Sequence, residues 1–319
     1  MNNLLLRTAI FAFTISLVLS PMFINAFRRF RFGQQIREEG PRRHLTKAGT
    51  PTMGGIIFLL SSLLVILIFT PKSTELYLVL FLTVGNGFVG FVDDFLKVVK
   101  KRSLGLKARV KLISQVILVI VFYFIWRELN FSTALLVPFT GYEIELGFLY
   151  LPFLTIFIIF FTNAVNLTDG IDGLAAGSAI LSFLSYLIIA VTGEFLGLAH
   201  FSAALIGATF SFLIYNLHPA KIFMGDVGSL SLGAALAAMA ILTKTELFLV
   251  IIGGIFVLEA SSVIIQVIFF QLTGKRIFRM SPLHHHFELG GRSEWQVVTG
   301  FWAAGFIFAV IALLQLGAL

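Results

Sequence analysis

Long apolar stretches follow one another along nearly the whole chain, with short polar segments between them. A helix that faces lipid is apolar nearly all round, so the length of each stretch is the main signal. A membrane-spanning helix needs roughly 20 apolar residues. The stretches fall at about 4–27, 53–70, 76–96, 112–126, 149–165, 174–192, 199–217, 228–242, 247–272 and 297–317. This pattern predicts an all-α integral membrane protein with about ten transmembrane helices, forming a single polytopic membrane domain over residues 1–319.

The composition supports this class and excludes others. The chain is 58% hydrophobic and 12% charged, about half the charged fraction of a globular protein, and its mean hydropathy is +0.98. A soluble fold, a secreted disulfide scaffold and a disordered chain are excluded. Cysteine is absent, so disulfides, thiolate metal sites and a Cys nucleophile are excluded too. The first stretch is too long for a signal peptide, and we expect it to be a retained span.

The charged residues alternate between the two ends of the expected spans. Nineteen of the 23 Lys and Arg residues fall in four segments, at about 28–52, 97–111, 216–229 and 273–296. Positive charge marks cytoplasmic loops, so both termini are predicted to be extracytoplasmic. The net charge of +7 then reflects orientation and not binding of nucleic acid. On the outer side, segment 139–147 alternates polar and apolar residues and predicts a small β-hairpin.

All aspartates lie on the predicted cytoplasmic side. The chain has five of them, Asp93, Asp94, Asp169, Asp172 and Asp226. Acids of the predicted outer loops are all glutamates. The chemistry of the chain is therefore expected at a single face of the membrane.

Asp93 and Asp94 close a glycine-rich apolar run and are followed by Lys97 and Lys100. A carboxylate deep in a bilayer costs roughly 2.5–3.5 kcal/mol, so two adjacent ones need a partner, a metal or a hydrated cleft. The alternative is a solvated pair at the headgroup level that binds the two lysines. We favour a functional role, because ionisable groups in membrane segments are usually functional.

Two further segments carry the remaining aspartates. Asp169 and Asp172 follow Asn166 in a loop with two Asp-Gly steps and no Lys or Arg. Asp226 stands between glycines just before a span. A carboxylate there could bind a metal ion, although turn formation and helix capping, by Asp226 or by Ser229, would explain the same residues.

Three consecutive histidines, His284, His285 and His286, lie in a polar segment near the C-terminal end. Adjacent positions are poor spacing for zinc ligands, so binding of a phosphate group and a solvated loop are the two interpretations. Lys47 and Thr52 flank another glycine-rich span start, which favours contact with phosphate. That segment is not a Walker A sequence.

Glu259 is an acidic residue in the middle of an expected span. We expect it to be a hydrogen-bonded residue between packed helices, and a functional role remains an alternative.

Clustered acids beside clustered bases at one membrane face suit a polyanionic substrate held through a divalent cation. Mg²⁺ prefers carboxylate and phosphate oxygens, and it would neutralise the repulsion between two phosphate groups. The residues thus predict phosphoryl transfer between a soluble donor and a membrane-embedded acceptor, without naming either. A secondary transporter is the alternative of another class; it would place acids near the midplane at a repeat interface.

Several motifs in order resemble a known family. GTPTMGG, VDDFLKVVKK, NLTDGIDGLA, NLHPAKIFMGD and SPLHHHFE resemble the phospho-N-acetylmuramoyl-pentapeptide transferase family, in the polyprenyl-phosphate N-acetylhexosamine-1-phosphate transferase superfamily. The resemblance implies transfer of phospho-MurNAc-pentapeptide from its UDP carrier to undecaprenyl phosphate, giving lipid I and UMP in peptidoglycan synthesis. It also implies Mg²⁺, ten spans with outward termini, an active site on the cytoplasmic face of the bacterial inner membrane, and a homodimer.

The resemblance also implies roles for individual residues. Asp93 would be the base that deprotonates the lipid phosphate, supported by Asp94. Asp226 would bind Mg²⁺, and in an older two-step scheme it would be a nucleophile. The uridine-side pocket would be formed by Asn166, Asp169, Asp172, Asn216 and Phe223. Contacts to phosphates or to the donor would come from Lys47, Thr52, Lys97, His284, His285 and His286.

The nearest rival within the superfamily is a polyprenyl-phosphate GlcNAc-1-phosphate transferase. SPLHHHFE resembles the muramoyl branch and favours that assignment. The peptide stem accepted, the dimer interface, the identity of the base and the choice between one step and two are left open by the sequence.

Overall fold

The computed structural model describes residues 2–30, 49–100 and 105–318. The helices are α1 (Asn2–Arg29), α2 (Gly55–Phe69), α3 (Thr74–Val99), α4 (Ala108–Arg127), α5 (Tyr150–Thr168), α6 (Leu174–Thr192), α7 (Leu196–Asn216), α8 (Gly225–Leu242), α9 (Glu246–Ile252), α10 (Gly254–Thr273), α11 (Leu283–Leu289) and α12 (Glu294–Gln315). Among the described residues, nine helices are long and apolar enough to cross a membrane. The predicted class, an all-α multi-pass membrane protein, is confirmed.

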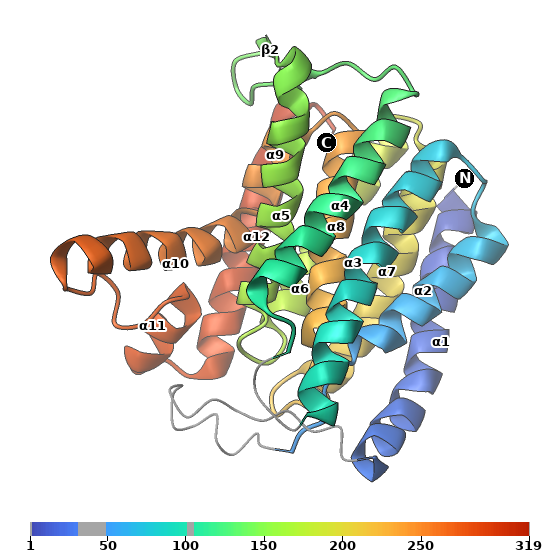
Figure 1. The fold of residues 1–319 in the computed structure, drawn as a ribbon. Helices are drawn as coiled ribbons and strands as arrows, with labels where there is room; N and C mark the ends of the chain where they lie inside the picture. Colours follow the sequence, from blue (N-terminus) through green and yellow to red (C-terminus); the bar gives the residue numbers. More distant parts are fainter. Residues whose placement is uncertain (1, 31–48, 101–104, 319) are drawn as a thin grey trace.

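Two expected spans differ from the prediction. The stretch expected at 53–70 forms α2, which has only 15 residues. The stretch expected at 247–272 is divided at Gly253 into the seven-residue α9 and the longer α10. Figure 1 shows α10 extending sideways from the bundle. Two successive glycines weaken a helix, whereas hydropathy stays high across the break and gives no warning of it.

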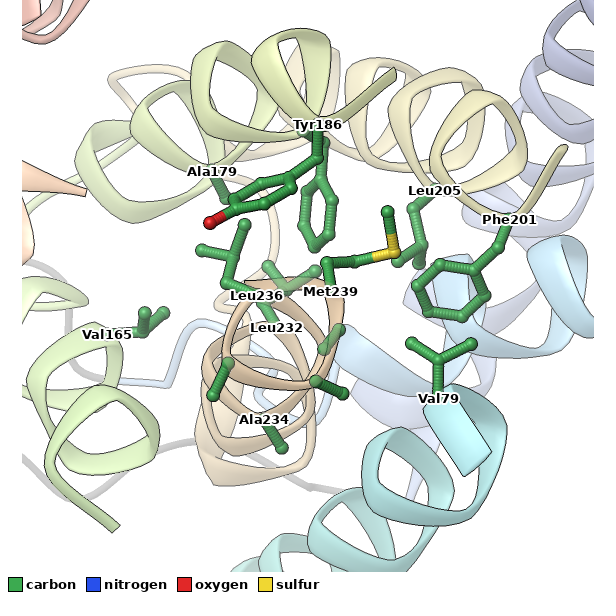
Figure 2. Packing of buried hydrophobic residues seen from close by; sticks show 14 of the residues in the cluster. Val79, Val165, Ala179, Tyr186, Phe201, Leu205, Leu232, Ala234, Leu236 and Met239 are labelled. Carbon is green, nitrogen blue, oxygen red and sulfur yellow. The ribbon is translucent and has the colours of Figure 1, made fainter. Parts of the chain in front are cut away.

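Helix α8 lies at the centre of the bundle. All its residues from Val227 to Leu242 are buried, since glycine and alanine make up much of its surface and allow neighbours to approach. Figure 2 shows side chains of α8 among those of α3, α5, α6 and α7. The labelled side chains of α8 are Leu232, Ala234, Leu236 and Met239, and around them lie Val79 of α3, Val165 of α5, Ala179 and Tyr186 of α6, and Phe201 and Leu205 of α7.

The predicted small hairpin is present. Strands β1 (Ala134–Leu136) and β2 (Glu143–Glu145) pair antiparallel, and a short 3-10 helix, η2 (Gly147–Leu149), leads into α5. The first strand precedes the segment in which the hairpin was expected. Both chain ends lie toward the hairpin end of the bundle (Figure 1). Which compartment this end faces stays a prediction.

Candidate functional site

Three aspartates from two helices meet where α3 packs against the start of α8. Asp93 and Asp94 are buried in the last turns of α3, and Asp226 lies in the first turn of α8. Gly90 permits this approach, because a Cβ there would overlap the main chain of Asp226. One oxygen from each carboxylate lies within 4.8 Å of the other two. Asp226 therefore forms one cluster with Asp93 and Asp94, although more than 130 positions separate it from them in the chain.

Two lysines bind this cluster. The Nζ atom of Lys97 lies 2.6 Å from Asp93 Oδ2, 3.3 Å from Asp94 Oδ1 and 3.1 Å from Asp226 Oδ1. Lys111 Nζ lies 2.7 Å from Asp226 Oδ2. Among the described residues, three carboxylates thus face two ammonium groups, which leaves a surplus of negative charge if all five groups are ionised.

The sequence did not single out Lys111. It lies in the first turn of α4, and a lysine at the start of an apolar run looks like any other residue that flanks a membrane span. The pairing becomes visible only once α4 is placed beside α3 and α8.

Main-chain amides hold the two buried aspartates of α3 in place. Asp94 Oδ2 accepts a hydrogen bond from Val227 N at 3.1 Å, and Asp93 Oδ1 accepts one from Leu106 N at 2.9 Å. Hydrogen bonds to a carboxylate stabilise its charged form. Both side chains are therefore fixed toward the cluster by α8 and by the segment that precedes α4.

Asn166 joins the third helix, α5, to the cluster. Its Nδ2 donates to Asp226 Oδ1 at 3.0 Å and to Ser229 Oγ at 2.8 Å. The predicted site residue therefore touches the proposed metal ligand. Ser229, which sequence analysis treated as a helix cap, instead supports Asn166 from within α8.

Asp169 follows directly after α5, half-buried beside the cluster. Its carboxylate accepts a hydrogen bond from the main chain of Gly225. Burial, then repulsion from Asp226, Asp94 and Asp172, raises the pKa of the Asp169 carboxyl well above its usual value. A cation near this loop would relieve that repulsion.

Asn216 connects the start of α6 with the loop before α8. Its Oδ1 accepts from Gly173 N at 3.1 Å, and its Nδ2 donates to the Ile222 carbonyl at 3.0 Å. The side chain is buried and both ends of its amide are used. Asn216 therefore shapes the loop around the predicted uridine pocket.

Thr52 and Phe223 lie on two segments that pair through their main chains. Phe223 N donates to the Pro51 carbonyl at 2.8 Å, and Gly54 N donates to the Phe223 carbonyl at 2.9 Å. Thr52 is buried against Gly225, next to Asp226. Lys47, the remaining residue predicted in this region, lies outside the described residues.

The three histidines lie on the short helix α11 and not in a loop. His284 is fully buried; its Nδ1 lies 3.1 Å from Glu259 Oε2, and its main-chain N donates to Glu259 Oε1. The predicted packing role of Glu259 is confirmed. His284 Nε2 is directed at Gly170 and has no hydrogen-bond partner among the described residues. This nitrogen reaches the loop that carries Asp169.

The other two histidines have different neighbours. His285 Nδ1 lies 3.0 Å from Glu288 Oε2, and His286 Nδ1 accepts a hydrogen bond from Arg279 N at 3.1 Å. The structure therefore brings His284 to the Asp169 loop and directs the Nδ1 atoms of His285 and His286 to partners on or just before α11.

Asp172 is also buried, but its carboxylate binds His218 and the main-chain N of Ala220, each at 3.1 Å. Its carboxylate is therefore grouped with His218 and Glu294, and not with the three aspartates at Lys97. The predicted residues fall into two groups: the carboxylates that meet at Lys97, and the loop residues around Asp172 and Asn216.

Comparison with known proteins identifies the class first. A model of glycosyl transferase family 4 matches residues 76–244, which include the three aspartates and both lysines of the cluster. A signature of phospho-N-acetylmuramoyl-pentapeptide-transferase matches residues 47–59.

The full chain gives the narrower family. Over 317 residues and 98% of both chains it is 53% identical to a phospho-N-acetylmuramoyl-pentapeptide-transferase of Geobacillus sp. (strain WCH70) and 50% identical to that of Bacillus subtilis (strain 168). A relative from Halalkalibacterium halodurans with the same name is 51% identical over 98% of both chains. The chain belongs to the phospho-N-acetylmuramoyl-pentapeptide-transferase family, a family of membrane-bound transferases.

Proposed function

We propose that this protein transfers phospho-MurNAc-pentapeptide from UDP-MurNAc-pentapeptide to undecaprenyl phosphate. An oxygen of the lipid phosphate forms a bond to the β-phosphorus of the donor, the bond from that phosphorus to the oxygen of UMP breaks, and UMP leaves. The product is lipid I, made in the first membrane step of peptidoglycan synthesis. In a chain of this family, the contact of Lys97 with three aspartates from two helices is the observation that carries the proposal.

The cluster has the donor set that Mg²⁺ prefers. Its carboxylate oxygens lie within 4.8 Å of one another, and Mg²⁺ is bound through one or two carboxylates together with phosphate oxygens of the substrate. We assign Asp226 as the ligand. When bound, Mg²⁺ would neutralise phosphate charge and orient the two phosphates toward each other.

Side chains of the protein would remove the proton and bind the phosphates. Asp93, whose Oδ1 is fixed by Leu106 N, would remove the proton from the lipid phosphate, with Asp94 beside it. Lys97, and Lys111 with it, would exchange carboxylate contacts for phosphate contacts when substrate binds. Asp226 already has both oxygens in contact with lysines and Asn166, which suits a cation ligand better than the nucleophile of a two-step reaction.

The donor would lie on the side of the Asp169 loop. The uridine pocket would be lined by Asn166, Asp169, Asp172, Asn216 and Phe223, with Phe223 stacking on uracil. Thr52, Lys47 and the histidines of α11 would contact phosphates or the sugar. His284 is the histidine best supported for this role, because its Nε2 is buried beside Gly170 and has no hydrogen-bond partner in the described part of the chain.

The cellular setting follows from the family and the charge pattern. We propose that residues 1–319 form one membrane domain in the bacterial inner membrane, with the aspartate cluster at the cytoplasmic face and both termini outside. We also propose that the protein functions as a homodimer.

The test is release of UMP by the purified protein from UDP-MurNAc-pentapeptide and undecaprenyl phosphate, with and without Mg²⁺. Release that requires all three components is the expected result. Mn²⁺ serves as a probe of the metal site that needs no turnover. The electron paramagnetic resonance signal of Mn²⁺ bound to the protein should be lost in Asp226→Asn.

A panel of donors separates the rival functions. Turnover with UDP-GlcNAc and none with UDP-MurNAc-pentapeptide would assign the chain to the GlcNAc-1-phosphate branch instead. Access to the aspartates from both sides of the membrane in turn, without UMP release, would favour a transporter. Single cysteines introduced into this cysteine-free chain allow that access to be measured by labelling.

A further inference from the structure

The ring of His284 on α11 is held by a buried carboxylate from another helix. The side chains of His284 and of Glu259, which lies on α10, are both fully buried. His284 Nδ1 lies 3.1 Å from Glu259 Oε2, and the main-chain N of His284 donates to Glu259 Oε1 at 3.2 Å. We propose that Glu259 is a positioning residue, which fixes the tautomer of His284 and presents its Nε2 atom to the nucleotide-sugar donor. This inference rests on the proposed function.

The two hydrogen bonds use both oxygens of the Glu259 carboxylate. The main-chain N–H of His284 can only donate, and it occupies Oε1. An ionised carboxylate only accepts, so the contact at Oε2 requires that Nδ1 carry the hydrogen. The hydrogen bond made by one ring nitrogen of a histidine determines the role of the other. In the neutral ring, Nε2 is then the acceptor.

Nε2 is the atom of this pair that lies next to the proposed donor pocket. It is buried and has no hydrogen-bond partner in the described part of the chain. A Cβ atom at Gly170 would overlap it, so Nε2 occupies the space that a side chain at position 170 would need. Gly170 is exposed and directly follows Asp169. A small shift of this loop would therefore bring Nε2 into contact with a hydroxyl or amide group of the donor.

Packing between α10 and α11 accounts for the contact at Glu259 but not for the state of Nε2. Apolar groups of similar shape in place of both partners of a buried hydrogen bond can be nearly neutral for stability, and they would leave no nitrogen unpaired. A buried polar atom without a partner costs free energy. A hydrogen-bond donor that arrives with the substrate would remove this cost, so the arrangement favours binding of substrate.

Glu259→Gln tests the tautomer, because glutamine keeps the shape of the side chain and removes one acceptor. Its amide has one oxygen and one NH₂ group. When the oxygen accepts from the main-chain N of His284, the NH₂ group faces Nδ1 and requires a lone pair there. The hydrogen of the ring then moves to Nε2. The same change in a catalytic triad keeps the geometry and lowers the rate, because the histidine has the wrong tautomer.

Two measurements follow the effect of this change. The ¹⁵N chemical shifts of protein labelled at histidine give the tautomer, and His284→Gln identifies the signals of His284. We expect the hydrogen on Nδ1 in wild type and on Nε2 in Glu259→Gln. Rates of UMP release give KM for each substrate. KM for UDP-MurNAc-pentapeptide should rise about ten- to hundredfold, the effect of one unpaired buried polar group, while KM for undecaprenyl phosphate should not change.

Ser262→Ala is the matched control on the same helix. Ser262 Oγ donates to the main-chain carbonyl of Glu259 at 2.7 Å, so this change removes a buried hydrogen bond beside Glu259 and leaves its carboxylate in place. The tautomer of His284 and KM for the donor should both stay as in wild type. An equal rise of this KM in Ser262→Ala and Glu259→Gln would assign the effect to the packing of α10 and overturn the proposal.

Two further results would overturn it: a hydrogen on Nε2 of His284 in wild type, or an unchanged KM for the donor in Glu259→Gln once the hydrogen has moved. Circular dichroism establishes that each variant is folded. If Glu259→Gln does not fold, wild type decides. UDP-MurNAc-pentapeptide added without undecaprenyl phosphate should shift the Nε2 signal of His284, and an unchanged signal contradicts the proposal.

Failure of the proposed function is distinguishable from failure of this inference. If wild type releases no UMP from UDP-MurNAc-pentapeptide, the proposed function is wrong, and the presentation of Nε2 to that donor is wrong with it. If wild type releases UMP and only the tautomer or the KM of Glu259→Gln disagrees, the proposed function stands and the role of Glu259 is contradicted.

Discussion

Lysine and carboxylate side chains meet at each end of helix α8, and the two groups differ. Its 18 residues separate them by about 27 Å at 1.5 Å per residue. At the start, Lys97 and Lys111 face three aspartates. Beyond its end, Lys244 Nζ lies 2.8 Å from Glu246 Oε1, which also accepts a hydrogen bond of 2.5 Å from the Tyr150 hydroxyl.

Exposure does not distinguish the two groups. The side chains of Lys97 and Lys244 are 29% and 26% exposed. The balance of charge distinguishes them. At the far end of α8, Lys244 pairs with Glu246. Lys244 Nζ also lies 4.8 Å from the centre of the Tyr150 ring, a favourable cation–π contact. At the aspartate end, the carboxylates outnumber the lysines of the described segments, which leaves room for a cation. Stoichiometry of charge, more than burial, separates a binding site from a structural ion pair.

The largest expected effect is that of Asp226→Asn on catalysis. The change removes the charge that would bind Mg²⁺ and should lower the rate of UMP release about a thousandfold, at the upper end of the loss seen when one electrostatic group is removed from an active site. Glu246→Gln is the matched control, which should keep activity within about twofold. Equal loss of activity in both variants would contradict the distinction between the two ends.

A smaller loss is expected when the helices are moved apart and the acids kept. Gly90→Ala places a methyl group against the main chain of Asp226, which cannot yield as a side chain can. A displacement of about 1 Å can cost a hundredfold in rate, and we expect a loss of that size in UMP release. Gly85→Ala, also on α3, meets only the end of the Leu118 side chain and should stay near wild type.

At the far end the expected effect is on stability. Glu246→Gln should lower the free energy of unfolding by about 1.5 kcal/mol, the contribution of a hydrogen bond to a charged group, because Lys244 and Tyr150 lose their ionised partner. Thermal unfolding in detergent measures it. Glu143→Gln on the exposed strand β2 is the control and should unfold at the same temperature as wild type. If Glu143→Gln were destabilised as much as Glu246→Gln, the stabilising role of the Glu246 contacts would be contradicted.

The sequence predicted the site better than the course of the helices. All five aspartates lie on one predicted face of the membrane, so the sequence predicted that some of them would meet. Asp93, Asp94 and Asp226 are close together in the structure. The partners that lie far away in sequence could not be predicted: Lys111 looks like a flanking lysine, and Glu294 like the first acid of a helix. Hydropathy likewise runs unbroken through Gly253, where α9 ends and α10 turns away, because lipid-facing and bent helices share one composition.

The remaining predictions concern the dependence of stability on pH, first at the aspartate end. Burial, and then repulsion from neighbouring carboxylates, raises the pKa of the Asp169 carboxyl. Folding therefore favours the protonated form, so its stabilisation is complete below the unfolded pKa of about 4 and is lost as pH rises through the folded pKa. Asp169→Asn does not titrate, and the melting temperature of wild type should fall relative to it as pH rises.

The hairpin at the other end should show the opposite sign. The exposed Glu145 carboxylate accepts hydrogen bonds from the Thr133 hydroxyl and from Gly147 N, and the first of these chiefly lowers its pKa. Its contribution is therefore present above the unfolded pKa and lost as pH falls. As the solution is acidified, the difference in melting temperature between Glu145→Gln and wild type should disappear. We expect this difference to be no larger than about one degree, because water screens exposed groups. The two variants should therefore differ in sign. If the melting temperatures of Asp169→Asn and Glu145→Gln, each relative to wild type, changed with pH in the same direction, the contrast would be contradicted: neighbours repel the charge of Asp169, whereas hydrogen bonds stabilise that of Glu145.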